Sequence, residues 1–152
     1  MNNRTPSSLE TEHAHGWPTH ADGTDVPSGS VFVFGSNLAR RHGAGAALHA
    51  LKRYGAVRGV GVGATGRSYA IATKGHRLEV LSIKAIAEHA AGFVAYARNN
   101  RDTSFFLTRV GCGLAGYADA DIAPLFVGLP KNVDIPFTWL SYLRRTSMRS
   151  GA

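Results

Sequence analysis

The 152-residue sequence predicts an α/β fold, in which a mostly parallel sheet is covered by helices on both faces. Three observations lead to it. Val31–Phe34 is a short, wholly apolar run of β-formers, which is typical of a strand buried on both faces. Stretches with helical spacing of apolar residues alternate with such runs, and this alternation is typical of parallel sheets. Glycine-rich loops follow the strands. The length suits one domain.

The first half of the chain is expected to begin with a flexible arm, residues 1–29, because it is rich in small polar residues and has no apolar period. Order is expected from Ser30, with the domain spanning residues 30–140. Gly55 suits the C-cap of the first helix, which also has Lys52 and Arg53 in its last turn. The predicted elements are a strand at Val31–Phe34, a helix at Gly45–Tyr54, a loop or edge hairpin at residues 55–66 and a strand at Ser68–Thr73.

The second half of the chain continues the alternation. Ser82 is predicted to cap a helix whose apolar residues recur at spacings of three and four. A basic tail, residues 141–152, carries Arg144, Arg145 and Arg149. The predicted elements are a helix from Ile83 to about Arg98, a strand at Ser104–Val110, a helix from Asp119 to Val127 and a short strand within Pro130–Trp139.

The composition favours anionic partners. Seventeen Lys and Arg residues against ten Asp and Glu residues give a net charge of +7, which suits nucleotides, nucleic acid or phosphate, although a merely solvated surface is an equal alternative. The 18 glycines have no period of three, so collagen is excluded. No uncharged apolar run is long enough to span a membrane, so we expect no membrane partner.

The cysteine and histidine content gives little reason to expect a metal. Cys112 is the single cysteine, which excludes an intrachain disulfide and a cysteine-based zinc site. His13, His15 and His20 lie in the predicted arm, where solvated side chains are the favoured reading over a metal site. We therefore expect neither metal nor cofactor. The N-terminal residues show no secretory signal, so a reducing cytosol, of a cell or of an infected host, is expected.

Three loops follow three predicted strands, at the edge where open parallel sheets bind ligands. Glycine lets backbone N–H groups approach a ligand, and a helix N-terminus adds positive potential, so the first and third loops suit a diphosphate. They match neither the Walker A loop nor the full dinucleotide fingerprint. The loops are Gly35-Ser36-Asn37 leading to His42-Gly43-Ala44-Gly45-Ala46-Ala47, then Thr73-Lys74-Gly75-His76, then Gly111-Cys112-Gly113-Leu114-Ala115-Gly116-Tyr117.

Three side chains in these loops each have two interpretations. Lys74 either directs an ammonium at a phosphate or ribose, or is an exposed loop lysine. Tyr117 either stacks on the ligand or closes the loop over the core. Cys112 is a nucleophile only if a helix N-terminus activates its thiolate, and its glycine neighbours favour a small buried side chain in a ligand loop.

The third loop resembles the macro-domain family, whose members bind ADP-ribose. Arg109-Val110 followed by the Gly111–Tyr117 loop is similar to the family's Gly-Cys-Gly-Leu loop, as also found in phage and bacterial proteins of this type. The first loop and helix are similar to the family's Gly-x-Gly-Ile-Ala stretch, Asn37 to a ligand-side asparagine, and Ala72-Thr73-Lys74 to a strand end with a functional lysine. The likeness covers residues 31–128 and implies a three-layer α/β/α domain with a mixed, mostly parallel central sheet.

The resemblance also implies roles for site residues. Lys74 and Asp119 are the candidate catalytic residues. Hydrolytic members often carry an aspartate where this chain has Ala115, so either Asp119 reaches back into the site or the domain only binds; a plain N-cap role is favoured for Asp119. The expected ligand-binding residues are Gly35, Ser36, Asn37, Gly43, Ala44, Gly45, Thr73, Gly111, Cys112, Gly113, Leu114, Ala115, Gly116 and Tyr117.

Three functions remain open from the sequence. The first is binding of ADP-ribose or a related NAD-derived nucleotide, with hydrolysis of an ADP-ribosyl linkage to DNA, protein or a 1″-phosphate as an optional activity. The second is a non-catalytic protein that sequesters such a nucleotide or masks ADP-ribosylated sites in a conflict between phage and host. The third is nucleic-acid binding through the net charge and the basic tail.

Overall fold

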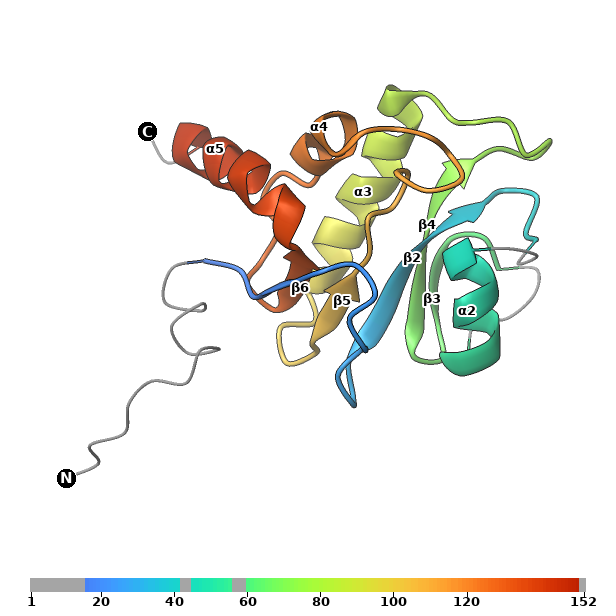
Figure 1. Ribbon diagram of the computed structural model, residues 1–152, viewed down its shortest axis with the longest axis horizontal. Helices are drawn as coiled ribbons and strands as arrows, with labels where there is room; N and C mark the ends of the chain where they lie inside the picture. Colours follow the sequence, from blue (N-terminus) through green and yellow to red (C-terminus); the bar gives the residue numbers. More distant parts are fainter. Residues whose placement is uncertain (1–15, 42–44, 56–59, 151–152) are drawn as a thin grey trace.

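A computed structural model describes residues 16–41, 45–55 and 60–150, with side chains described up to residue 145. Six strands form one sheet in the order β1-β6-β5-β2-β4-β3 (Figure 1). The strands are β1 (Thr19–His20), β2 (Val31–Asn37), β3 (Gly63–Thr65), β4 (Ser68–Lys74), β5 (Phe105–Leu107) and β6 (Val133–Pro136). The helices are α2 (Gly45–Arg53), α3 (Ile83–Arg98), α4 (Asp119–Ile122) and α5 (Leu140–Ser150), with short 3-10 turns at Ala123–Leu125 (η1) and Phe137–Trp139 (η2).

The sheet is mixed and mostly parallel, which confirms the predicted fold class. β2 lies at its centre and pairs in parallel with β4 and β5, and the pairs β5–β6 and β6–β1 are also parallel. Only β3 is antiparallel, against β4, so the loop expected as an edge hairpin does form one. The carboxyl ends of β2, β4 and β5 therefore meet at one edge of the sheet.

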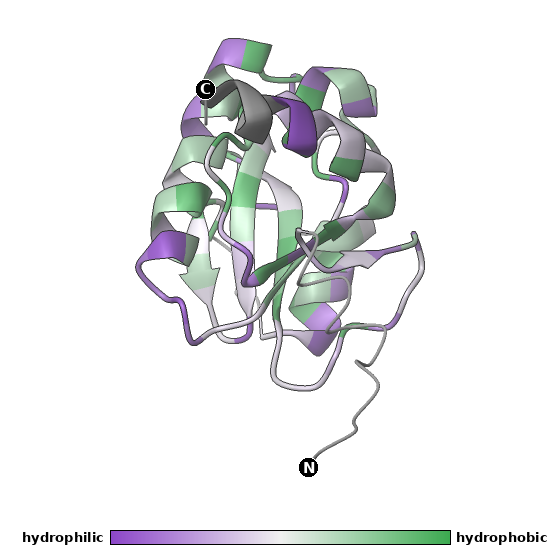
Figure 2. Ribbon diagram, turned by 90° about the vertical axis from the view of Figure 1, so that its left-hand side faces the viewer, coloured by the Kyte–Doolittle hydropathy of each residue, from purple (hydrophilic) through white to green (hydrophobic). Residues whose placement is uncertain are grey.

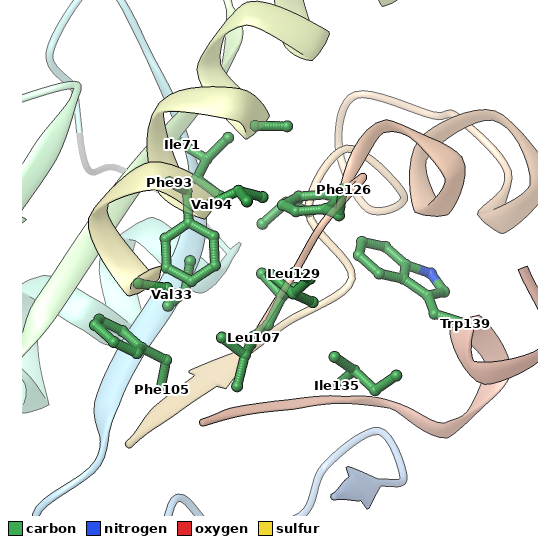
Figure 3. Close-up of a cluster of buried hydrophobic side chains, with 14 of the residues drawn as sticks. Val33, Ile71, Phe93, Val94, Phe105, Leu107, Phe126, Leu129, Ile135 and Trp139 are labelled. Carbon is green, nitrogen blue, oxygen red and sulfur yellow. The ribbon is translucent and has the colours of Figure 1, made fainter. Parts of the chain in front are cut away.

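Helices pack on the two faces of the sheet, because β2 directs alternate side chains to opposite sides. Phe32 and Phe34 pack with α2, whereas Val33 joins a larger core beneath α3. Figure 3 shows part of this larger core, where Phe93 of α3 meets Phe105 and Leu107 of β5, with Trp139 farther along. The strands in the middle of the molecule carry mostly apolar residues (Figure 2). This arrangement is compatible with the three layers expected.

The inner helices form as the sequence predicts. Ser82 caps α3, with its Oγ accepting a hydrogen bond from the Ala85 N–H at 3.2 Å. Gly55 follows α2 with a φ of +71°, the left-handed conformation expected of a C-cap glycine. The helix predicted from Asp119 ends earlier, at Ile122, and continues as a 3-10 turn containing Pro124, whose missing N–H cannot sustain the α-helix. The strand expected at Ser104–Val110 is limited to Phe105–Leu107.

The described part of the predicted arm is not loose, which corrects the sequence interpretation. Trp17 is 6% exposed and its Nε1 donates to the Leu129 carbonyl at 3.0 Å. β1 pairs with β6, and the His20 ring stacks on Phe106 at 3.8 Å while its Nδ1 lies 2.7 Å from Asp134 Oδ1. Two residues of strand and one buried indole make too short a pattern to stand out in a polar stretch. Residues 1–15, with His13 and His15, lie outside the described residues.

The basic tail, for which the sequence indicates no secondary structure, is helical over residues 140–150, which form α5. Leu143 is 2% exposed within the larger core, and Leu140 and Tyr142 pack against that core. Arg144 and Arg145 are exposed. Across the described ranges, no helix is both long and apolar enough to cross a bilayer.

Candidate functional site

A pocket of about 590 Å³ lies at the sheet edge where β2, β4 and β5 end. Its volume is within the range usual for small-molecule sites. The three loops singled out from the sequence all contribute to it, together with the start of α2. Its walls are formed by Gly35, Ser36, Asn37, Arg41, Gly45, Ala46, Ala47, Thr73, Lys74, Leu78, Thr108, Arg109, Val110, Gly111, Gly113, Leu114 and Ala115.

Glycine is required at one position of the wall between β2 and the third loop. Gly111 has a φ of +77°, and a Cβ there would come within 3.0 Å of Ile122 Cδ1. A Cβ on Gly35 would lie 3.4 Å from Thr73 Oγ1 and 3.6 Å from the Gly111 nitrogen, which are ordinary contact distances. Gly35 thus lies against both β4 and the third loop, and Gly111 gives that loop its turn.

The third loop presents unused backbone donors to the pocket. Its shape is held by hydrogen bonds from the Cys112 N–H to the Arg109 carbonyl (3.1 Å) and from the Tyr117 N–H to the Gly111 carbonyl (2.9 Å). Among the backbone N–H groups between these two bonds, that of Gly116 donates to the Gly113 carbonyl at 3.0 Å. Those of Gly113, Leu114 and Ala115, which line the pocket, donate to no backbone carbonyl of the described residues. Such donors form a concavity suited to an anion.

The start of α2 faces the same space. Gly45, Ala46 and Ala47 of its first turn line the pocket, and a helix leaves its first N–H groups without intrahelical acceptors. The Leu114 side chain lies close by, 3.4 Å from the point where a Gly45 Cβ would stand. Two sets of backbone donors therefore bound one cavity.

Lys74 ends β4 at the pocket wall. Its backbone is paired with Asn37 in the sheet, and its carbonyl accepts from the Leu38 N–H at 2.8 Å. The half-buried ammonium is ion-paired with no carboxylate of the described ranges. The next turn returns to Lys74 through a bridge with Val80. The backbone of Lys74 is thus held by hydrogen bonds of the sheet. Its side chain has no carboxylate partner among the described residues and is available to a ligand.

The side chain of Asn37 holds the loop after β2, a role that the sequence does not indicate. Its Oδ1 accepts from the Arg41 N–H at 2.8 Å, and its Nδ2 donates to the Arg41 carbonyl at 2.7 Å. The amide therefore fastens the loop after β2 and so places Arg41 at the pocket. One N–H and one oxygen lone pair remain for a ligand.

Asp119 does not line the pocket, contrary to its expected catalytic role. Its oxygens accept from Arg109 Nε at 2.8 Å and Nη2 at 3.1 Å, and from Trp139 Nε1 at 2.6 Å. Burial acts to raise the pKa of Asp119, but these hydrogen bonds outweigh it and hold the pKa below its usual value. Asp119 is therefore an ionised anchor that orients Arg109.

Arg109 lines the pocket and also reaches the N-terminal segment, with Nη1 2.9 Å from Asp22 Oδ2. Hydrogen bonds to Asp119 and Asp22 raise the pKa of Arg109, so the guanidinium remains charged. Arg109 belongs to the third-loop motif, but the sequence pattern indicates no role for it. Its pairing with a residue ten positions later and another 87 positions earlier is visible only in three dimensions.

Cys112, Gly116 and Tyr117 of the third loop are not among the residues that line the pocket. Cys112 and Tyr117 pack against the larger core, and the Tyr117 hydroxyl donates to the Leu81 carbonyl at 2.7 Å. Burial, followed by the negative charge of Asp119, raises the pKa of the Cys112 thiol to about 12. The thiol is therefore protonated at neutral pH and is not an activated nucleophile.

The remaining residues predicted to bind a ligand either line the pocket or lie outside the described part of the chain. The expected ligand residues brought together in the wall are Gly35, Ser36, Asn37, Gly45, Thr73, Gly111, Gly113, Leu114 and Ala115, along with Lys74. Gly43 and Ala44 lie outside the described residues. Leu78 is a wall residue that the sequence did not indicate, since it follows the strand by four positions in a polar turn.

Comparisons of the chain with protein-family models, with curated proteins and with solved structures found no match. Its function is therefore argued from the pocket.

Proposed function

We propose that the pocket binds a nucleotide diphosphate of the ADP-ribose type. The observation that carries the proposal is the charge of the wall. Arg41 and Lys74 line it with no carboxylate partner among the described residues, Arg109 lines it as the partner of Asp119 and Asp22, and none of the described wall residues has a carboxylate. Such a wall favours an anion. The resemblance of the third loop to macro domains supports the nucleotide identity.

Backbone donors give the anion its geometry. A diphosphate has several oxygens at short spacing, and it needs donors from more than one direction. Gly113, Leu114 and Ala115 supply N–H groups from one side, and the first turn of α2 supplies them from another. The ammonium group of Lys74, in the same wall, adds a positive charge to these N–H groups. The volume of about 590 Å³ leaves space for sugar and base beside the phosphates.

The proposal is for binding without hydrolysis. Ala115 lines the pocket where the resembled hydrolytic members carry an aspartate, and Asp119 is held by Arg109 and Trp139 outside the wall. No described carboxylate is thus positioned to activate water beside the ligand. This favours a protein that sequesters or recognises the nucleotide.

Calorimetric titration with ADP-ribose tests the proposal. We expect a Kd in the micromolar range, about −8 kcal/mol, and weaker binding of AMP, which lacks the diphosphate. The absence of binding at millimolar ADP-ribose contradicts the proposal. Release of ADP-ribose from an ADP-ribosylated protein by the wild-type chain contradicts the non-catalytic part of it.

A charge variant with a neutral partner makes the titration specific to the pocket. Ala46 lies in the first turn of α2, where Glu suits the helix dipole and so preserves the fold. Ala46→Glu adds a carboxylate to the wall and is expected to weaken ADP-ribose binding about tenfold or more. Ala46→Gln adds the same bulk without charge and is expected to bind more tightly than Ala46→Glu. Equal loss in both variants indicates steric exclusion only and removes the charge argument.

A further inference from the structure

The mouth of the pocket is flanked by two loops that carry exposed arginines. Arg40 precedes the wall residue Arg41 in the loop after β2, and Arg77 precedes the wall residue Leu78 in the turn after β4. The loops are held together by the hydrogen bond from the Leu38 N–H to the Lys74 carbonyl. In Figure 1 both loops lie at the right-hand side, far from α5 at the left.

These arginines are unpaired with the carboxylates of the described chain. The ion pairs formed there involve His20 with Asp134, and Arg109 with Asp22 and Asp119. Glu79, the acidic residue of the second loop, accepts from the backbone N–H of Arg77 at 2.9 Å and occupies the place of a Gly75 side chain. The carboxylate of Glu79 is therefore hydrogen-bonded to the backbone of its own turn. The side chains of Arg40 and Arg77 are exposed to solvent.

Two exposed apolar side chains line the pocket near these loops. Leu78 is 41% exposed with a φ of +62°, and Leu114 is 69% exposed, and both line the pocket. Large exposed apolar side chains beside unpaired cations match a chain that alternates phosphates with flat apolar groups. The bases of a single strand are unstacked and expose flat apolar faces that are free for contact with protein side chains, whereas the bases of a duplex are stacked on one another.

We infer that this rim, formed by Arg40, Arg77, Leu78 and Leu114, is a docking surface for single-stranded nucleic acid. The phosphates lie on Arg40 and Arg77, and bases contact the two leucines across the mouth of the pocket. Arginine suits this role because its planar fork matches phosphate oxygens. The site differs from the one that the sequence suggested, which was the C-terminal basic segment now seen as α5.

Fluorescence anisotropy with a labelled oligodeoxythymidylate tests the inference. For about three phosphate contacts, those of Arg40, Arg77 and Arg41, the single-strand slope of log K against log salt is about −2, so affinity is expected to fall about 20-fold between about 50 and 200 mM salt. Arg40→Ala/Arg77→Ala is expected to weaken binding about tenfold or more and to reduce the slope by about 1.4.

A second double variant provides the matched control. Arg144→Ala/Arg145→Ala removes the same charge from the exposed face of α5, and it is expected to keep most of the affinity. Thermal melting confirms that each variant is folded, and the wild-type salt slope is independent of any variant. Equal loss in both variants, loss only in the α5 variant, or no binding at low salt overturns the inference. Binding of poly-glutamate as strong as that of the oligonucleotide also overturns it.

The outcome is separable from the nucleotide proposal. Arg40 and Arg77 lie outside the pocket wall, so calorimetric binding of ADP-ribose by Arg40→Ala/Arg77→Ala should persist even when oligonucleotide binding is lost. Failure of ADP-ribose binding in the wild type rejects the pocket's ligand alone, and failure of oligonucleotide binding rejects the rim alone.

Discussion

Removal of the Asp119 carboxylate should destabilise the whole domain. Asp119→Ala leaves the Trp139 indole N–H, on a fully buried side chain, without its acceptor, and an unsatisfied buried donor costs about 1–3 kcal/mol. The ion pair to Arg109 adds about 0–1 kcal/mol, because that guanidinium is 34% exposed and keeps Asp22 as a partner. The expected loss in free energy of unfolding is about 1–4 kcal/mol.

Urea unfolding followed by tryptophan fluorescence measures this loss, with Asp22→Ala as the control. Asp22 bonds the same arginine but its side chain is 69% exposed, so its replacement should cost less than about 1 kcal/mol. If Asp119→Ala is no less stable than Asp22→Ala, the anchoring role of Asp119 is refuted. A fully stable Asp119→Ala protein that lost a hydrolytic activity would instead restore the catalytic role.

The pH dependence of this difference has a definite sign. The folded pKa of Asp119 lies below its usual value, which is about 3.9 in an unfolded chain. The stabilisation is therefore complete above pH about 4 and is lost as pH falls through the lower folded pKa. The gap in stability between the wild type and Asp119→Ala should narrow only below about pH 4, and a gap that narrows between pH 8 and 6 contradicts the argument.

Three further predictions concern separate parts of the chain. Lys74→Ala should weaken ADP-ribose binding about 10- to 150-fold in calorimetry, the equivalent of a charged hydrogen bond of about 1.5–3 kcal/mol, whereas Lys52→Ala, in the last turn of α2, should leave it unchanged; equal effects would exclude a contact by Lys74. Gly92→Ala should raise the melting temperature by about 2–4 °C, because Gly92 is an exposed mid-helix residue with open space at its Cβ, and a lowered value would show that the site is crowded. Cys112, with a pKa of about 12, should react with a disulfide reagent at pH 8 far more slowly in the folded than in the urea-unfolded protein, and equal rates would contradict its burial.

The sequence predicted the interior of the fold because its signals there are long or strongly capped. Val31–Phe34 is apolar throughout, and Ser68–Thr73 has four consecutive residues, Tyr69 to Ala72, that are apolar or aromatic. Ser82 with sixteen helical residues behind it defines α3. The ends of the chain carry weaker signals. Trp17 lies in a polar stretch, and Leu143 lies at the start of a segment rich in arginine and serine. What fixes both is the tertiary contact each makes in the larger core, which has no local period.

The site was predictable to the same extent. Gly35, Gly45 and Gly111 could be identified because each lies near the end of a predicted strand or at the start of a predicted helix. The topology does bring their segments together at one sheet edge. The role of Asp119 could not be predicted. Whether its carboxylate faces the pocket or Arg109 depends on side-chain directions, which the sequence does not show. Leu78 is part of the wall because its own backbone adopts the left-handed conformation. The turn sequence His-Arg-Leu-Glu contains no residue type that predicts this conformation.

A crystal structure of the chain soaked with ADP-ribose tests the central claim most directly. The account predicts diphosphate oxygens at hydrogen-bond distance, about 2.7–3.1 Å, from the N–H groups of Leu114 and Ala115 and from the first turn of α2, with Lys74 facing the ligand. It also predicts that Asp119 stays on Arg109 and Trp139. A nucleotide bound elsewhere, or an empty pocket at millimolar ligand, would contradict it.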